Sequence, residues 1–145
     1  MDWQKNILNT DAEIKQLLTN TKRIAVLGIK TEAQSFQPAF YVPQYMANAG
    51  FEIVPVPVYY PEATEILSKK VYRNLVDVPG EIDLVNVFRR SADVPKHLED
   101  ILAKKPKAVW LQSGIRHDEV ARQLAENGIK VVQDLCLMVE HRSIR

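Results

Sequence analysis

The chain has 145 residues, of which 46% are hydrophobic and 26% are charged, and its formal net charge is +1. This length suits one domain with one core, and the near-neutral charge gives no reason to expect a nucleic acid or an anionic membrane as a partner. A single cysteine, Cys136, excludes an internal disulfide, and no apolar run approaches the roughly 20 residues of a membrane-spanning helix. We therefore expect one cytoplasmic domain over residues 1–145, with no signal peptide at its start.

The first half of the chain predicts helices and strands in alternation. Apolar residues recur at helical spacing after Asp11, a candidate N-cap, and a short apolar run that ends at Gly28 is typical of a buried parallel strand. The next apolar run contains Pro55 and Pro57, whose missing N–H groups face the same neighbour. We therefore expect either full pairing on one side only or fraying near the end of the strand. In chain order, the expected elements are a helix over residues 11–20, a strand over 23–28, a helix over about 39–48, a strand over 51–58 and a short helix near 62–69.

The second half continues this alternation. Ser91 or Asp93 is a candidate N-cap, and Gly128 is a candidate C-cap. In chain order, the expected elements are a strand over residues 83–88, a helix over 94–104, a strand over 108–112, a helix over 116–127, a strand over 129–132 and a helix over 135–142. Elements of these lengths form right-handed βαβ units. The sequence therefore predicts an α/β fold, a Rossmann-like open, mostly parallel five-stranded sheet with helices on both faces.

Basic residues follow several of the predicted strands. Lys30 follows the first strand, Arg89 and Arg90 follow the third, and Arg116 follows the fourth, with no acidic residue directly among them. In open α/β sheets, ligands bind outside the carboxyl ends of the strands. We interpret this edge as a site for an anionic ligand. The alternative is that these basic residues lie on a solvated rim.

The motifs of the commonest nucleotide sites are absent. The loop over residues 28–33 has one glycine, Gly28, where the dinucleotide fingerprint needs three. The second strand ends in Pro57 and Val58 instead of the acidic residue that would hold the ribose of NAD. The Gly-Lys-Ser/Thr pattern of magnesium–ATP sites is also missing. A phosphate-bearing ligand that is neither NAD nor a magnesium–ATP complex remains.

Several stretches resemble the small stand-alone CoA-binding proteins, which are related to the CoA-binding domain of the succinyl-CoA synthetase α subunit. The most specific are Val-Phe-Arg at residues 87–89 and Trp-Leu-Gln-Ser-Gly-Ile at residues 110–115. The full set of similar stretches, in the order of the family, is residues 24–28, 54–56, 83–89, 108–115 and 131–141. The resemblance implies a Rossmann-type sheet with coenzyme A at its switch point.

The resemblance also implies where each part of the ligand would lie. The diphosphate would lie over residues 28–31, the adenosine near residues 56–58, and the pantetheine arm beside residues 112–115. The implied cofactor-binding residues are Gly28, Ile29, Lys30, Thr31, Ser35, Val56, Pro57, Val58, Phe88, Arg89, Arg90, Gln112, Ser113, Gly114 and Ile115. The chain departs from the family at residues 35–38, where Ser-Phe-Gln-Pro stands in place of Ser-Arg-Pro, and at residues 57–58, where many relatives have Asn-Pro.

No set of residues predicts a catalyst or a metal site. His117 follows the predicted loop over 112–115, but near a helix start a histidine is more often a surface residue. Cys136 has no histidine base near it in sequence, which favours a buried apolar cysteine, and we expect Trp110 to lie in the core. We therefore expect a non-catalytic binding or regulatory module for CoA or an acyl-CoA. The alternatives are an enzyme or enzyme subunit acting on a CoA thioester and an NAD(P)-binding redox regulator, and a homodimer or a protein partner is also open.

Overall fold

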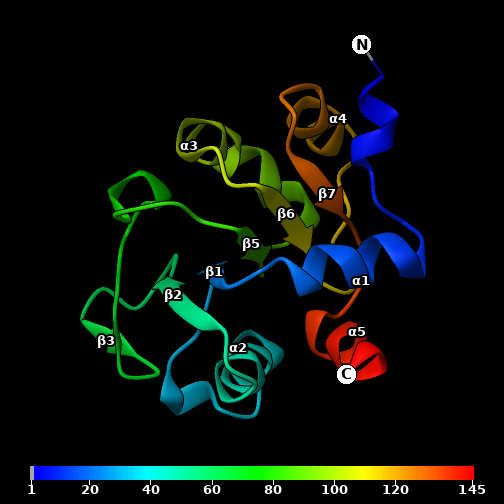
Figure 1. The fold of residues 1–145 in the computed structure, drawn as a ribbon. Helices are drawn as coiled ribbons and strands as arrows, with labels where there is room; N and C mark the ends of the chain where they lie inside the picture. The colour runs from blue at the N-terminus through cyan, green and yellow to red at the C-terminus, as the bar shows by residue number, and fades with distance from the viewer. Residues whose placement is uncertain (1) are drawn as a thin grey trace.

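A computed structural model describes residues 2–145 and contains one five-stranded sheet with helices on both faces (Figure 1). All neighbouring strands of this sheet are parallel, in the order β2-β1-β5-β6-β7. The strands are β1 (Arg23–Leu27), β2 (Glu52–Val56), β5 (Leu84–Val87), β6 (Ala108–Leu111) and β7 (Lys130–Val132). The helices are α1 (Asp11–Thr19), α2 (Pro38–Asn48), α3 (Leu98–Lys104), α4 (Asp118–Glu126) and α5 (Leu137–Ile144). The predicted Rossmann-like α/β class is confirmed.

The central strands are buried on both faces, which explains their continuous apolar sequence. In β1, Ile24 and Val26 pack with α1, α2 and α5, whereas Ala25 and Leu27 pack with α3 and α4. Figure 1 shows the same division, with α1, α2 and α5 on one side of the sheet and α3 and α4 on the other. Trp110 of β6 is fully buried, as expected, and its indole N–H donates to the carbonyl oxygen of Leu135 at 2.8 Å.

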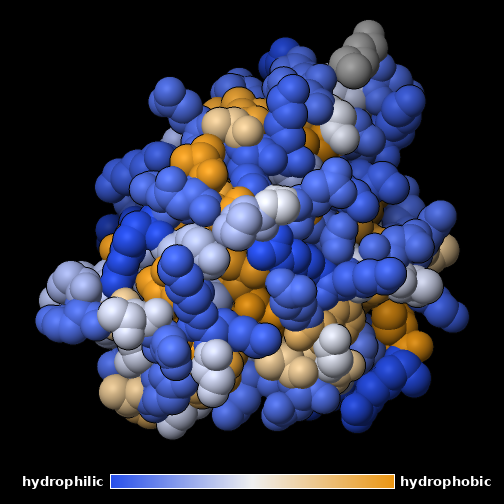
Figure 2. Space-filling model, turned by 60° about the vertical axis from the view of Figure 1, so that its left-hand side comes forward, coloured by the Kyte–Doolittle hydropathy of each residue, from blue (hydrophilic) through white to orange (hydrophobic). Residues whose placement is uncertain are grey.

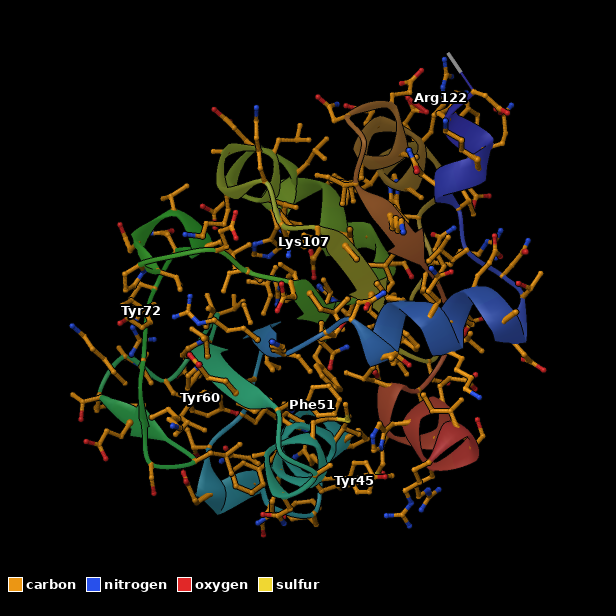
Figure 3. The ribbon with its side chains drawn as sticks, in the orientation of Figure 1. Tyr45, Phe51, Tyr60, Tyr72, Lys107 and Arg122 are labelled. Carbon is orange, nitrogen blue, oxygen red and sulfur yellow. The ribbon has the colours of Figure 1, made fainter. Side chains whose placement is uncertain are left out.

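Both edges of the sheet are covered by irregular segments. At β2, whose sheet partner is β1, the N–H of Tyr72 donates to the carbonyl oxygen of Pro55 at 2.9 Å, and Tyr72 lies along this edge in Figure 3. At β7, the N–H of Leu8 donates to the carbonyl oxygen of Val131 at 2.8 Å. The prediction that the proline-containing strand is fully paired on one side only is confirmed.

The segment between β2 and β5 differs from its prediction. The helix expected near residues 62–69 is wrong, because the chain forms a hairpin of β3 (Glu65–Ile66) and β4 (Lys69–Lys70). Leu67 and Ser68 turn with φ of 53° and 62°, which no right-handed helix allows. Long-range contacts select this shape. Ile66 is buried in the core on the face of the sheet that α2 covers, and the guanidinium of Arg73 donates to the carbonyl oxygens of Tyr59, Tyr60 and Ala63. A short 3-10 turn, η3 (Leu75–Asp77), follows the hairpin. Figure 2 shows this side of the molecule, whose surface is mostly hydrophilic with scattered apolar patches.

Two expected helix starts also differ. Asp11 does not cap α1, because Thr10 does: its Oγ1 accepts the N–H of Glu13 at 3.2 Å, and the carboxylate of Glu13 accepts the N–H of Thr10 at 3.1 Å. The helix expected over 94–104 begins as a 3-10 helix, η4 (Ser91–His97), before α3. Pro95 lacks an N–H and restricts the residue before it, and neither Ser91 nor Asp93 caps this segment.

Two further 3-10 segments complete the structure, η1 (Trp3–Asn6) before α1 and η2 (Glu32–Gln34) between β1 and α2. None of the described helices combines the length and the apolar character that crossing a membrane requires.

Candidate functional site

The switch point of the sheet lies between β1 and β5. The chain leaves β1 for β2 on one side and later returns to β5 on the other side, so a crevice opens at the carboxyl ends of these strands. The loops that follow them touch: Gly28 has a φ of 90°, and a Cβ at this position would lie 2.3 Å from the carbonyl oxygen of Phe88. Only glycine fits here without moving the backbone.

Two hollows lie at this edge. The first, the Gln112 hollow, has a volume of about 530 Å³ and is lined by Lys30, Gln37, Pro38, Ala39, Phe88, Arg89, Arg90, Gln112, Ser113, Gly114 and Ile115. The second, the Pro57 hollow, has a volume of about 400 Å³ and is lined by Leu27, Pro57, Val58, Arg73, Asn74, Lys96, His97 and Asp100. A hydrogen bond between Arg89 and His97 joins the wall of one hollow to the wall of the other.

Most of the residues predicted for the site line these hollows. Eight line the Gln112 hollow, namely Lys30, Phe88, Arg89, Arg90, Gln112, Ser113, Gly114 and Ile115, and two line the Pro57 hollow, Pro57 and Val58. Ile29 and Val56 are buried in the core, and the side chain of Thr31 is turned to Gln34 at the start of η2. Ser35 is exposed at the end of η2 and lines neither hollow.

The basic edge contains an acidic residue that the sequence interpretation missed. Asp93 is 5% exposed, and its Oδ2 lies 3.0 Å from Nε of Arg90 and 3.8 Å from Nη2 of Arg89. Its Oδ1 lies 3.0 Å from Nζ of Lys96. Hydrogen bonds from Lys96 and Arg90 lower the pKa of Asp93 to about 2. Three cations therefore share one carboxylate, and the edge stays positive but carries less free charge than its basic residues alone suggest.

Arg89 is the arginine held at the switch point. Its Cδ lies 3.3 Å from the Cβ position at residue 28, and its side chain is 24% exposed, compared with 85% for Arg90. Its Nε–H donates to Nε2 of His97 at 3.1 Å. Burial, and then the charge of Arg89, lower the pKa of His97. The sequence offered no signal for this pair, because residues 89 and 97 come together only through the 3-10 winding of η4.

A buried amide pair, Asn86 and Gln112, lies at the Gln112 hollow, which Gln112 itself lines. Asn86 Nδ2 donates to Oε1 of Gln112 at 3.2 Å, and the same Oε1 accepts the N–H of Leu137 at 3.2 Å. Gln112 is 4% exposed. The Gln112 side chain therefore ties β5 and β6 to the start of α5, and these hydrogen bonds hold it in one position at the wall of the hollow.

The remaining candidates lie outside the hollows. Arg116 pairs with Asp118 at 3.0 Å on the surface, so it does not join Lys30 and Arg89. His117 is the N-cap of α4, and its Nδ1 accepts the N–H of Val120 at 3.2 Å. Cys136 is only half-buried and packs beside the core at the start of α5. Over residues 2–145, no three metal-ligating side chains come together.

Comparison with known proteins places the chain among its relatives. A family model for a CoA binding domain matches residues 22–142. The uncharacterized protein YneT of Bacillus subtilis (strain 168) is 38% identical over 130 residues, which are 90% of this chain and 93% of that protein. A solved structure from Thermus thermophilus, cell-free ID.343, is 39% identical with a TM-score of 0.86 and covers 94% of this chain and 100% of its own.

A more distant structure shares the fold alone. The dinucleotide forming acetyl-coenzyme A synthetase 1 of Ca. Korarchaeum cryptofilum, in complex with phosphate and ADP, is 21% identical with a TM-score of 0.67 over 80% of this chain and 26% of that chain. The family match is much more extensive, since residues 22–142 include the Gly28 loop and every residue that lines the two hollows. This chain therefore belongs to the CoA binding domain family.

Proposed function

We propose that this protein binds coenzyme A or an acyl-CoA at the carboxyl ends of its strands, as a non-catalytic binding or regulatory module. The observation that carries the proposal is the close contact of Gly28 with Phe88, with Arg89 held directly beside it. A backbone without a side chain next to a fixed guanidinium suits a diphosphate, because the phosphates can approach main-chain N–H groups and a cation together. Membership of the CoA binding domain family favours CoA among diphosphate ligands.

The two hollows suit the two ends of such a ligand. Pro57 and Val58 offer an apolar wall for an adenine in the Pro57 hollow. Phe88 and Ile115 offer apolar contacts for a pantetheine arm in the Gln112 hollow, where Gln112 adds a polar group. The diphosphate would then lie between them, over the loop that begins at Gly28.

Lys30 supplies a cation in place of the arginine of the Ser-Arg-Pro stretch, which this chain lacks in its first loop. Its ammonium group donates to Oε1 of Gln37, the N-cap residue of α2. The cation is therefore held at the start of an 11-residue helix, whose dipole also favours a negative group.

The chemistry of the hollows favours binding over catalysis. The imidazole that lines the Pro57 hollow, His97, already accepts a hydrogen bond from Arg89, so it is not free to act as a base. Cys136 and His117 lie elsewhere. The rival NAD(P)-binding regulator is disfavoured by the single glycine of the first loop and by Pro57 and Val58 at the end of β2.

A thermal-shift panel tests the ligand. CoA, acetyl-CoA, dephospho-CoA, NAD, NADP and ATP are compared, and CoA at about 100 times its Kd is expected to add about 2.7 kcal/mol to the free energy of unfolding. Strong stabilisation by NAD with none by CoA overturns the proposal. Turnover of acetyl-CoA, followed by release of free thiol, would favour the enzyme instead of the binding module.

Charge variants test the position of the diphosphate. Arg89→Ala and Lys30→Ala are each expected to weaken CoA binding about tenfold or more, because hydrogen bonds to charged groups contribute about 1.5–3 kcal/mol. Arg116→Ala is the matched control, because Arg116 lines neither hollow, and its affinity should equal that of the wild type. Calorimetric titration measures all three, and unchanged affinity in both test variants would place the phosphates elsewhere.

A further inference from the structure

One side of the Arg89 guanidinium is held by protein groups. Its Nε–H donates to Nε2 of His97 at 3.1 Å, and its Nη2 lies 3.8 Å from Oδ2 of Asp93. The side chain passes beside Gly28, with its Cδ 3.3 Å from the Cβ position there. These two partners already hold the guanidinium in one plane. Its remaining N–H groups are therefore available to a ligand over the Gly28 loop, and binding costs little further side-chain entropy.

His97 can accept this hydrogen bond only as a neutral imidazole. A protonated imidazole has no acceptor nitrogen, and a neutral one that accepts at Nε2 carries its proton on Nδ1. Burial and the neighbouring charge of Arg89 lower the pKa of His97, which keeps it neutral at pH 7.

Besides Arg89, the charged groups around His97 come from three segments. Asp93 and Lys96 lie on η4, Asp100 lies on α3, and Arg73, from the segment after β4, lines the same hollow. The carboxylate of Asp100 accepts the N–H groups of Leu75 and Val76, at 2.8 and 3.2 Å, and so is already engaged. Asp93 keeps its charge down to about pH 2 and is held by Lys96 and Arg90.

On the basis of the proposed CoA function, we propose that His97 is a positioning residue whose neutral imidazole holds Arg89 toward the ligand diphosphate, so that protonation of His97 releases Arg89 and weakens binding. When the ring takes up a proton, the hydrogen bond at 3.1 Å is replaced by contact between two cations. Asp93, whose Oδ2 lies 3.8 Å from Nη2 on the same edge of the guanidinium, stays negative at the same pH and is the protein partner that Arg89 keeps.

The experiment uses dephospho-CoA as the probe. Its diphosphate has no group that titrates between pH 5 and 8, unlike the 3′-phosphate of CoA, because a phosphate monoester has a second pKa near 6. Calorimetric titration of the wild type is expected to give about tenfold weaker binding at pH 5 than at pH 7.5, the effect of losing one hydrogen bond to a charged group.

Two variants and one control separate the role of His97 from a structural one. His97→Gln keeps an uncharged acceptor, so it should keep the wild-type affinity at pH 7.5 within about threefold and show no loss at pH 5. His97→Ala should bind about tenfold more weakly at pH 7.5, with an equally flat profile. His117→Asn keeps a residue that caps α4 well and lies outside both hollows, so it should follow the wild-type profile.

Each outcome is decisive. A flat profile in the wild type, or unchanged affinity in His97→Ala, overturns the role of His97 and leaves the proposed function standing. No binding by the wild type at pH 7.5 overturns the proposed function and this inference with it. Nitrogen NMR of the ligand-free protein gives a separate readout: the Nδ1–H tautomer of His97 is expected at pH 7.5, and the Nε2–H tautomer overturns the inference.

Discussion

At Gly28 the backbone meets two constraints together. Its φ is 90°, which L side chains rarely adopt, and its Cβ position lies 2.3 Å from the carbonyl oxygen of Phe88. A methyl group here would push apart the loops after β1 and β5, which form the switch point. Gly28→Ala is therefore expected to lower the free energy of unfolding by about 3 kcal/mol, measured by urea denaturation, and to weaken CoA binding as well.

Gly50 provides the matched control for that variant. Its φ is 105°, yet nothing lies within 4 Å of its Cβ position. Gly50→Ala should show the backbone strain alone, about 1 kcal/mol, with unchanged CoA affinity. Equal losses in the two variants would contradict the importance of the contact with Phe88.

At the level of elements, α1 begins through a reciprocal pair of hydrogen bonds between Thr10 and Glu13. The sequence interpretation placed the cap one residue later, at Asp11. Thr10→Ala is expected to lower the free energy of unfolding by about 1 kcal/mol, whereas Asp11→Ala should cost only a few tenths of a kcal/mol through the helix dipole. Urea denaturation of both variants checks this order, and a larger loss in Asp11→Ala would contradict the capping arrangement.

Lowered pKa values in several parts of the molecule predict that its free energy of unfolding falls as the pH falls. Burial lowers the pKa of His97 and of His141, and the ring of His141 packs against Tyr45 and Phe51, which lie beside α5 in Figure 3. Burial of Asp83 would raise its pKa, but the N–H groups of Arg23 and Lys22 outweigh this, and hydrogen bonds from Lys96 and Arg90 lower the pKa of Asp93 to about 2.

These shifts predict a decline in two stages on acidification. Above pH 6.5, the ordinary pKa of histidine, both imidazoles contribute fully to the free energy of unfolding. Below pH 6.5 the unfolded chain takes up protons before the folded protein does, so the free energy of unfolding falls. The carboxylates contribute fully above their ordinary value of 3.8, and their contribution is lost as pH falls toward 2. Melting temperature against pH measures both stages.

A double variant isolates the upper stage. Because glutamine does not titrate, His97→Gln combined with His141→Gln should remove the decline that begins at pH 6.5 and leave the one that begins at 3.8. A melting temperature that rises between pH 7 and pH 5 in the wild type would contradict these pKa directions.

The sheet and most of the lining residues were predictable from the sequence. The parallel strands are buried on both faces, so runs such as residues 24–27 are apolar throughout and can be identified locally. The carboxyl ends of the strands then bring Lys30, Arg89 and Gln112 to one edge. Ser35 and Arg116 follow the right elements but line neither hollow, because the direction of a side chain at a loop depends on its neighbours in space.

The sequence by itself determined the alternation of strands and helices, the glycine at the switch point and the gathering of basic residues there, because each depends on local periodicity and on the geometry of parallel sheets. Only the tertiary structure decided that residues 65–70 form a hairpin, that Asp93 is shared by Arg90 and Lys96, and that His97 accepts from Arg89. These arrangements depend on which groups other elements shield from water. The energies of burial and of charge pairing depend on contacts between segments that are distant in sequence, so no single segment reveals them.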